Sequence, residues 1–380
     1  MIEQRKKHLS RSRRVVIKVG SSLLTGSKAT GLQSGFIRNL ARQIKTLQSD
    51  GRQCLVVTSG AIAFGLQEMG WDRRPREIPR LQALAAVGQS NLMQAYETAF
   101  GKVGLKVAQV LLTQDDLSDR NRYSNAHNTL EELFRYAIIP VVNENDTVVV
   151  QEIKFGDNDT LASLVAHLVE ADLLVLLTDT KGLYRADPKV DPDAELIRDV
   201  FKWDPAIDQA AGRSGSLVGT GGMLTKVRAA KRMMRSGVPM VIAPGSTKDV
   251  LLKLFKGDAI GTFFHPVEKR MASRKRWLAW GVRAKGDVVV DEGARRALVE
   301  RNTSLLPSGV RRTTGRWEAG EVVRILDIDQ REIARGVANV SSQEMEKIKG
   351  LKTADAARTL GHNIPEEVIH RDNMVRTEEL

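Results

Sequence analysis

Two lysines lie where phosphate groups could bind. Lys18 ends an apolar run and precedes Gly20 and Ser21, whose turn can bring backbone amides close to an anion. Lys226 follows a glycine-rich stretch that opens a helical pattern, where loop amides and the positive end of the helix dipole favour a polyphosphate. That stretch comprises Thr220, Gly221, Gly222, Met223, Leu224, Thr225 and Lys226. It is neither a Walker loop nor a dinucleotide fingerprint, because no glycine precedes the lysine directly and a third spaced glycine is missing.

Carboxylates and amides concentrate in two further segments. Asn143 to Asp146 close an apolar run, and Asp157, Asn158 and Asp159 precede a helical pattern. This pattern favours binding of an amino group or metal cation, or the positioning of lysines, over ordinary turns and helix caps. A calcium loop is excluded because the three residues are consecutive and no downstream glutamate follows. The six histidines show no zinc-ligand spacing, so we assign no metal ligands.

Two more loops follow apolar runs. Thr58, Ser59 and Gly60 open a helical pattern and could receive a carboxylate or phosphate, although an ordinary N-cap is the alternative. Thr178 and Asp179 would add polar contacts to a nucleotide site.

Together these segments indicate phosphoryl transfer without an evident general base. A hydroxyl acceptor would normally require a base, whereas a carboxylate acceptor is already ionised at neutral pH. Positioning and charge neutralisation could then supply most of the catalysis. The pattern therefore predicts a kinase that acts on a carboxylate.

The elements that position these loops alternate between short apolar runs and longer helical patterns. This alternation predicts an α/β fold with a mainly parallel sheet sandwiched by helices, and ligands collect at the carboxyl ends of such strands. The expected strands are Arg14–Val19, Gln53–Val57, Val107–Leu112, Ile138–Val142, Leu173–Leu177 and Val238–Ile242. The expected helices are Pro79–Phe100, Asn125–Tyr136, Leu161–Val169 and Val227–Arg235.

The length of 380 residues favours two domains. We expect a kinase domain at 1–268, a basic linker at 269–282, a small mainly β domain at 283–375 and a frayed tail at 376–380. In the small domain we expect a helix at Ala294–Glu300 and strands at Asp287–Val290, Leu305–Leu306, Val322–Leu326, Glu332–Val340 and Val368–Ile369.

Composition narrows the class of protein. The net charge of +12 favours anionic substrates or RNA, but a solvated basic surface explains it equally well. The single cysteine, Cys54, lies in an apolar run and is interpreted as a small buried residue. No apolar stretch of signal-peptide or membrane-spanning type follows the basic start, so we expect a cytoplasmic protein without a membrane partner.

The loops resemble those of the amino acid kinase family, in particular its members that phosphorylate glutamate. The matching segments are Val16–Leu24, Thr58–Gly65, Arg122–Thr129, Asn143–Asp146, Glu152–Thr160, Leu177–Pro188 and Gly219–Lys226. The resemblance implies that ATP and glutamate give glutamyl 5-phosphate and ADP, the first step of proline biosynthesis, with Mg²⁺ bound mainly through the ATP phosphates. It also implies oligomers and inhibition by proline, which we take as hypotheses.

The same resemblance implies a role for each matching residue. Lys18 and Lys226 would neutralise the transferring phosphoryl group, and Asp159 would hold both lysines in place. The residues implied for glutamate are Ser59, Asp146 and Asn158, with Asp157 near them. The residues implied for ATP are Lys18, Thr178, Asp179 and the loop from Thr220 through Gly221, Gly222, Met223, Leu224 and Thr225 to Lys226.

The C-terminal part resembles a PUA domain, a small β-barrel found on RNA-modifying enzymes. The segments Asp291–Ala294, Ser304–Gly309 and Glu367–Arg371 carry this resemblance. RNA binding is therefore an open expectation for this part of the chain.

Two alternatives stay open. A sister kinase acting on aspartate, acetylglutamate or a nucleoside monophosphate would share the fold and the ATP loops. A protein whose main function is RNA binding would explain the basic linker, but Trp277 and Trp280 form no recognisable stacking motif and the catalytic loops would lack a purpose.

Overall fold

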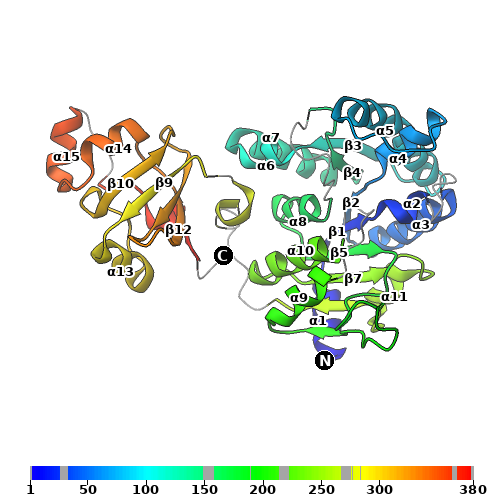
Figure 1. Ribbon diagram of the computed structural model, residues 1–380. Helices are drawn as coiled ribbons and strands as arrows, with labels where there is room; N and C mark the ends of the chain where they lie inside the picture. Colours follow the sequence, from blue (N-terminus) through cyan, green and yellow to red (C-terminus); the bar gives the residue numbers. More distant parts are fainter. Residues whose placement is uncertain are drawn as a thin grey trace. The chain divides into compact units, whose positions relative to one another are not determined.

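The computed structural model describes residues 2–25, 33–148, 158–188, 190–213, 222–266, 275, 277–282, 284–361 and 366–377. The chain forms two compact units, Met1–Arg270 and Met271–Leu380 (Figure 1). Three of the expected site residues, Asp157, Thr220 and Gly221, lie outside the described residues.

The first unit contains an eight-stranded sheet in the order β3-β4-β2-β1-β5-β7-β8-β6. In this order, neighbouring strands from β3 through β7 are parallel, and β8 is antiparallel to β7. The expectation of a mainly parallel sheet is therefore confirmed. The strand bounds are β1 Arg14–Val19, β2 Gln53–Val57, β3 Val107–Leu112, β4 Ile139–Glu144, β5 Leu173–Thr178, β6 Asp199–Val200, β7 Met240–Pro244 and β8 Thr262–Phe264.

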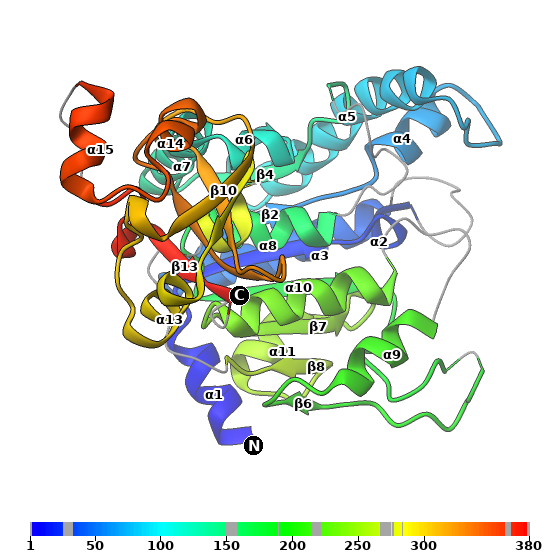
Figure 2. The same cartoon turned by 60° about the vertical axis from the view of Figure 1, so that its left-hand side comes forward.

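Helices cover both faces of this sheet (Figures 1 and 2). One face packs against α3, α5 and α11, which share a buried core with β1, β2 and β5. The other face packs against α8 and α10. The helix bounds are α1 Ile2–Arg11, α2 Ser21–Thr25, α3 Ser34–Ser49, α4 Ala61–Glu68, α5 Ile78–Gly101, α6 Gln114–Ser118, α7 Arg120–Arg135, α8 Asn158–Leu168, α9 Pro205–Arg213, α10 Met223–Arg235 and α11 Val250–Lys256.

The alternation of side chains along β1 places Lys18. Val15 and Ile17 lie in the core beneath α3 and α5. Since successive strand residues point to opposite faces, Lys18 points to the face covered by α8. The strand period alone therefore places the Lys18 side chain on the face opposite the core formed with α3 and α5.

Three helices of the first unit begin earlier than their apolar patterns indicated. α7 begins at Arg120 instead of Asn125. α8 begins at Asn158 instead of Leu161, and α10 begins at Met223 instead of Val227. The first turn of α8 is polar and does not continue the apolar pattern, whereas Met223 and Leu224 in α10 are separated from that pattern by Thr225 and Lys226. Asn158 and Asp159 are consequently on a helix and not in a loop.

Cys54 is buried on β2, and burial raises the pKa of its thiol to about 12. Its interpretation as a small apolar core residue is confirmed.

The second unit contains a five-stranded sheet in the order β10-β9-β11-β12-β13. Its strands are β9 Gly286–Val290, β10 Val310–Gly315, β11 Val322–Leu326, β12 Glu332–Val337 and β13 Met374–Arg376, with helices α13 Glu292–Arg301, α14 Ser342–Ile348 and α15 Thr353–Leu360. The expectation of a mainly β unit is confirmed.

Several details of this unit differ from expectation. No strand was expected at β10 and no helix at α14 or α15, and β12 ends at Val337 instead of Val340. Leu305–Leu306 and Val368–Ile369 are not strands, and Leu305 and Ile369 pair as an isolated bridge. Arg376, expected in a frayed tail, ends β13 and donates a hydrogen bond to the backbone oxygen of Val299 at 3.0 Å. Part of the expected linker, Trp277–Gly281, forms a π-helical turn that contacts β12 and β13. Each of these segments is a few residues long, so its regular structure depends on contacts with residues distant in the sequence.

Candidate functional site

Two lysines and one carboxylate form the charged centre of the first unit. Asp159 lies in the first turn of α8 and is fully buried. Lys18 Nζ on β1 lies 2.7 Å from Asp159 Oδ1, and Lys226 Nζ on α10 lies 3.0 Å from Asp159 Oδ2. Both lysines are more than 90% buried, at 5% and 7% exposed. One carboxylate therefore holds two ammonium groups from residues that lie 208 positions apart in the sequence.

The charges of this lysine cluster, Lys18, Asp159 and Lys226, do not cancel. Burial alone would raise the pKa of Asp159, but the charges of the two lysines outweigh it. Together with hydrogen bonds from Lys18 and Thr225 they lower this pKa to about 2. With both lysines protonated, the cluster carries a net single positive charge at neutral pH. Such a preorganised, water-poor cation pair can stabilise charge on a phosphoryl group.

The start of α10 is tied to the same carboxylate. The Thr225 hydroxyl lies 2.8 Å from Asp159 Oδ2 and 2.8 Å from the backbone oxygen of Gly222, the N-cap of α10. Met223 and Leu224, also expected at the ATP site, are half-buried in the same first turn. The glycine-rich stretch therefore joins the lysine cluster through the helix that it opens.

A cluster of neutral polar groups lies beside the lysine cluster. Asn158 Nδ2 donates to the backbone oxygen of Thr58 at 2.7 Å, to Ser59 Oγ at 2.9 Å and to Asn143 Oδ1 at 3.0 Å. Asn143 Nδ2 in turn donates to Gln89 Oε1 at 2.8 Å. We call Ser59, Asn158, Asn143 and Gln89 the amide cluster. It brings the ends of β2 and β4 together with the start of α8.

Asp146 follows β4 and is half-buried. Burial raises the pKa of its carboxyl to about 6, and the positive charge of Arg74 partly opposes this rise. Its charge state therefore changes close to neutral pH. No hydrogen bond within the described residues joins Asp146 to Ser59 or Asn158, so the structure does not bring these expected glutamate ligands into direct contact.

Thr178 and Asp179 lie at the carboxyl end of β5, beside β1 in the sheet. The Thr178 hydroxyl donates to Asp179 Oδ1 at 3.0 Å, and the Thr178 backbone oxygen accepts from the amide of Gly245 at 2.8 Å. The backbone oxygen of the preceding Leu177 accepts from the amide of Gly20 at 3.2 Å. These bonds join the β5 loop to the turn that follows Lys18.

The sequence patterns singled out Thr58 and Asn143 but did not indicate that they hold Asn158, and they missed Gln89 and Tyr96. Thr58 and Asn143 accept from Asn158, Gln89 accepts from Asn143, and Tyr96 OH lies 3.0 Å from Thr58 Oγ1. Asn143 belonged to the polar segment that ends at Asp146, which was a usable signal. Gln89 and Tyr96 lie on a long helix with an ordinary helical pattern, and no feature of the sequence distinguishes them.

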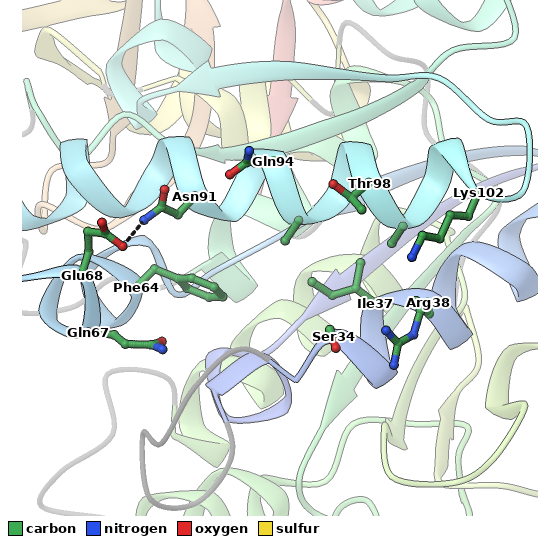
Figure 3. A pocket seen from close by; sticks show the side chains of 12 residues that line it. Ser34, Ile37, Arg38, Phe64, Gln67, Glu68, Asn91, Gln94, Thr98 and Lys102 are labelled. Atoms are coloured by element: carbon green, nitrogen blue, oxygen red, sulfur yellow. Dashed lines mark hydrogen bonds between the residues drawn. The ribbon is translucent and has the colours of Figure 1, made fainter.

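A separate pocket of about 350 Å³ lies between α3, α4 and α5 (Figure 3). Ile37 and Phe64 form an apolar wall of the pocket, and Arg38 and Lys102 lie at one end of it. None of the expected site residues lines this pocket. It is therefore distinct from the two clusters.

The described residues contain no group of three His, Cys, Asp or Glu side chains that could hold a metal ion. The two oxygens of Asp159 face ammonium groups. A divalent ion at this site would therefore have to be held largely by its substrate, as is common for Mg²⁺ on nucleotide phosphates. In the part of the chain that the structure describes, no helix is long and apolar enough to cross a membrane.

Known proteins show the same two-part organisation. The model of the amino acid kinase family matches residues 13–244, and the model of the PUA domain matches residues 286–360. Glutamate 5-kinase from Geobacter sp. (strain M21) is 49% identical over 98% of this chain and 99% of its own length. Glutamate 5-kinase from Burkholderia thailandensis is 49% identical over 96% of this chain and 98% of its own.

A solved structure supports the fold of the first unit. Carbamate kinase from Giardia lamblia bound to AMP-PNP covers 67% of this chain and 99% of its own, with a TM-score of 0.50 and 18% identity. At this identity the likeness shows the fold alone. The two family models and the near full-length relatives show that the chain belongs to the amino acid kinase family and, within it, to the glutamate 5-kinases with a C-terminal PUA domain.

Proposed function

We propose that the chain transfers the γ-phosphoryl group of ATP to the side-chain carboxylate of glutamate, giving glutamyl 5-phosphate and ADP. The observation that carries this proposal is the buried Asp159 carboxylate with two ammonium groups at 2.7 and 3.0 Å, beside a neutral amide cluster. The site has cations for a phosphoryl group and needs no general base for an acceptor that is already ionised.

The lysine cluster would stabilise the transition state. Lys18 and Lys226 approach the developing negative charge from β1 and α10, while Asp159 fixes the positions of their ammonium groups. Because these charges are positioned before the reaction, little reorganisation is needed when charge spreads over the phosphoryl oxygens.

The amide cluster would bind the amino acid. Ser59 Oγ accepts from Asn158, so its own proton is available to donate to a substrate carboxylate. Asn158 Oδ1 is buried and has no partner among the described residues, so it can accept from the substrate ammonium group. Asp146 would add a negative charge for that ammonium group, with Asp157 nearby.

The nucleotide would bind at the loops of β5 and α10. Thr178, Asp179 and the segment Thr220 to Lys226 supply the contacts, and the N-terminus of α10 faces the phosphates. Mg²⁺ would enter as the complex with ATP, where it neutralises phosphate charge.

The test is ADP release by the purified full chain with ATP and Mg²⁺, with and without glutamate, in the presence of hydroxylamine. Glutamate-dependent ADP with an equal amount of hydroxamate establishes transfer to a carboxylate. ADP without hydroxamate would contradict it, and so would an absence of glutamate-dependent ADP.

A substrate panel separates glutamate from the substrates of sister kinases. We expect glutamate to exceed acetylglutamate and UMP in kcat/KM, because the amide cluster offers groups for a free ammonium and a second carboxylate. We expect glutamate to exceed aspartate as well, because the near full-length relatives are glutamate 5-kinases. If aspartate exceeds glutamate, the proposed acceptor is wrong.

RNA binding as the main function is disfavoured by the second unit. Several of its arginines are paired with carboxylates: Arg324 with Asp287 at 2.6 Å and Arg311 with Asp291 at 3.0 Å. Such pairs leave less charge for phosphate contacts. RNA filter binding at two salt concentrations tests this: tight, strongly salt-dependent binding without glutamate-dependent ATP turnover would reverse the assignment.

We further propose a cytoplasmic homo-oligomer that proline inhibits, with a kinase domain at 1–268. The basic linker ends before the π-helical turn at Trp277, and the second domain extends from that turn to Arg376. Family membership supports these properties. Light scattering of the purified chain measures the oligomer, and titration with proline at fixed glutamate measures inhibition.

A further inference from the structure

We propose that Gln89, on α5, is a positioning residue that sets glutamate affinity by fixing which way the amides of Asn143 and Asn158 point. This inference rests on the proposed function. Gln89 is half-buried, and within the described part of the chain its hydrogen bond to the site is the one from Asn143, so we treat it as a positioning residue and not as a catalytic group.

The orientation of the Asn158 amide is fixed by a backbone carbonyl oxygen, which can accept a hydrogen bond but cannot donate one. The backbone oxygen of Thr58 can only accept, so Asn158 must turn its Nδ2 towards it, at 2.7 Å. The same Nδ2 faces Ser59 Oγ and Asn143 Oδ1. Asn158 Oδ1 is consequently directed away from these acceptors, buried and without a partner among the described residues. This is the oxygen that would receive the substrate ammonium group.

The same donor-to-acceptor direction continues from Asn158 through Asn143 to Gln89. Because Asn143 Oδ1 accepts from Asn158, Asn143 Nδ2 must find an acceptor elsewhere, and Gln89 Oε1 lies 2.8 Å from it. Gln89 Nε2 then donates to Gln109 Oε1 at 3.3 Å on the exposed side of β3. Without the Gln89 oxygen, Asn143 could rotate its amide and place its NH₂ against the NH₂ of Asn158. That rotation would weaken the hold on Asn158.

Close packing of two helices delivers Gln89 to this position. A Cβ atom added to Gly88 would lie 1.9 Å from the backbone oxygen of Ala61, and one added to Gly65 would lie 1.9 Å from the backbone oxygen of Leu84. α4 and α5 therefore touch backbone to backbone at the two glycines. Since α4 starts directly after Ser59 and Gly60, this contact couples the residue after Gly88 to the loop that binds substrate.

The test compares variants of Gln89 with a matched glutamine on the same helix. Gln89→Leu removes the acceptor, whereas Gln89→Glu keeps an oxygen acceptor at the same reach. Gln94→Leu is the control, because Gln94 is exposed and lines the separate pocket between α3, α4 and α5 (Figure 3). Gln89→Asn keeps the amide but shortens its reach, and it provides a second test if the leucine variant folds poorly.

We expect Gln89→Leu and Gln89→Asn to raise the KM for glutamate about tenfold, as for a lost hydrogen bond that leaves a buried donor unpaired. The KM for ATP and kcat should stay within about twofold in both, and Gln89→Glu should recover most of the glutamate affinity. Gln94→Leu should behave as wild type.

An unchanged KM for glutamate in folded Gln89→Leu or Gln89→Asn would overturn the inference. An equal rise in the KM for ATP, or no recovery in Gln89→Glu, would also overturn it and leave a merely structural role. These comparisons require that the wild-type chain first shows glutamate-dependent hydroxamate formation. If the wild type lacks that activity, the proposed function itself fails.

Discussion

The lysine cluster and the amide cluster lie side by side but are built on different physical principles. In the lysine cluster, two buried ammonium groups lie 2.7 and 3.0 Å from the oxygens of an oppositely charged carboxylate. The amide cluster has no net charge and is directed by a chain of donors and acceptors that starts at the Thr58 backbone. Charge suits a transferring phosphoryl group, and directed neutral groups suit recognition of a zwitterion.

Two consecutive residues of α8 separate these functions. Asn158 and Asp159 are adjacent in sequence, and successive residues of an α-helix point about 100° apart. Asn158 therefore reaches the β2 and β4 loops, while Asp159 reaches β1 and α10. If the two clusters are as separate in function as in geometry, mutations in the first should lower kcat and mutations in the second should raise the KM for glutamate.

The largest expected effect is that of Asp159→Asn. Without the carboxylate, two buried ammonium groups face each other, so we expect kcat to fall by about a thousandfold or more and the free energy of unfolding to fall by about 3 to 5 kcal/mol. Steady-state kinetics and urea unfolding measure the two quantities. Asp208→Asn is the control, because Asp208 pairs with Lys231 at 3.3 Å at the surface. Normal turnover in Asp159→Asn would contradict the role of the lysine cluster.

Lys18→Ala and Lys226→Ala should each lower kcat by about a hundredfold to a thousandfold, since one preorganised charge is lost at the transition state. The fold should be retained, as circular dichroism would show. Lys231→Ala, on the same helix as Lys226 but half-exposed, should change turnover little. Near-normal turnover in both site variants would remove the mechanism.

Asn158→Ala should raise the KM for glutamate about tenfold to a hundredfold, because it removes the oxygen proposed for the ammonium group and the bond to Ser59. We expect kcat to change only a few-fold. If kcat falls as far as it does in the lysine variants, the two clusters act as one unit and the comparison fails.

The smallest effect should be a pH dependence of the KM for glutamate that arises from Asp146. The pKa of Asp146 is raised to about 6, so its carboxylate is charged above this pH and loses its attraction for an ammonium group below it. The KM for glutamate should therefore rise as pH falls below about 6, by up to about tenfold per unit. Asp146→Asn should flatten this rise. An identical pH profile in wild type and variant would exclude Asp146 as its source.

Local patterns in the sequence determined the strands β1, β2 and β3, the mainly parallel sheet and the polar segments that contain Lys18, Asp159 and Lys226, because strand period and polar interruptions are local properties. They did not determine the starts of α7, α8 and α10, because the first turns of these helices do not continue the apolar pattern that follows.

The tertiary structure, and no local pattern, brings one carboxylate to two lysines 208 positions apart, Lys18 and Lys226, as the family resemblance implied. It also decided that Gln89 would direct Asn143 across 54 positions of sequence. Such contacts depend on the packing of α8, α10 and α5 around the sheet, and in particular on the glycines that let α4 and α5 touch. A helix with an ordinary apolar pattern gives no local sign of which of its polar residues will face a site.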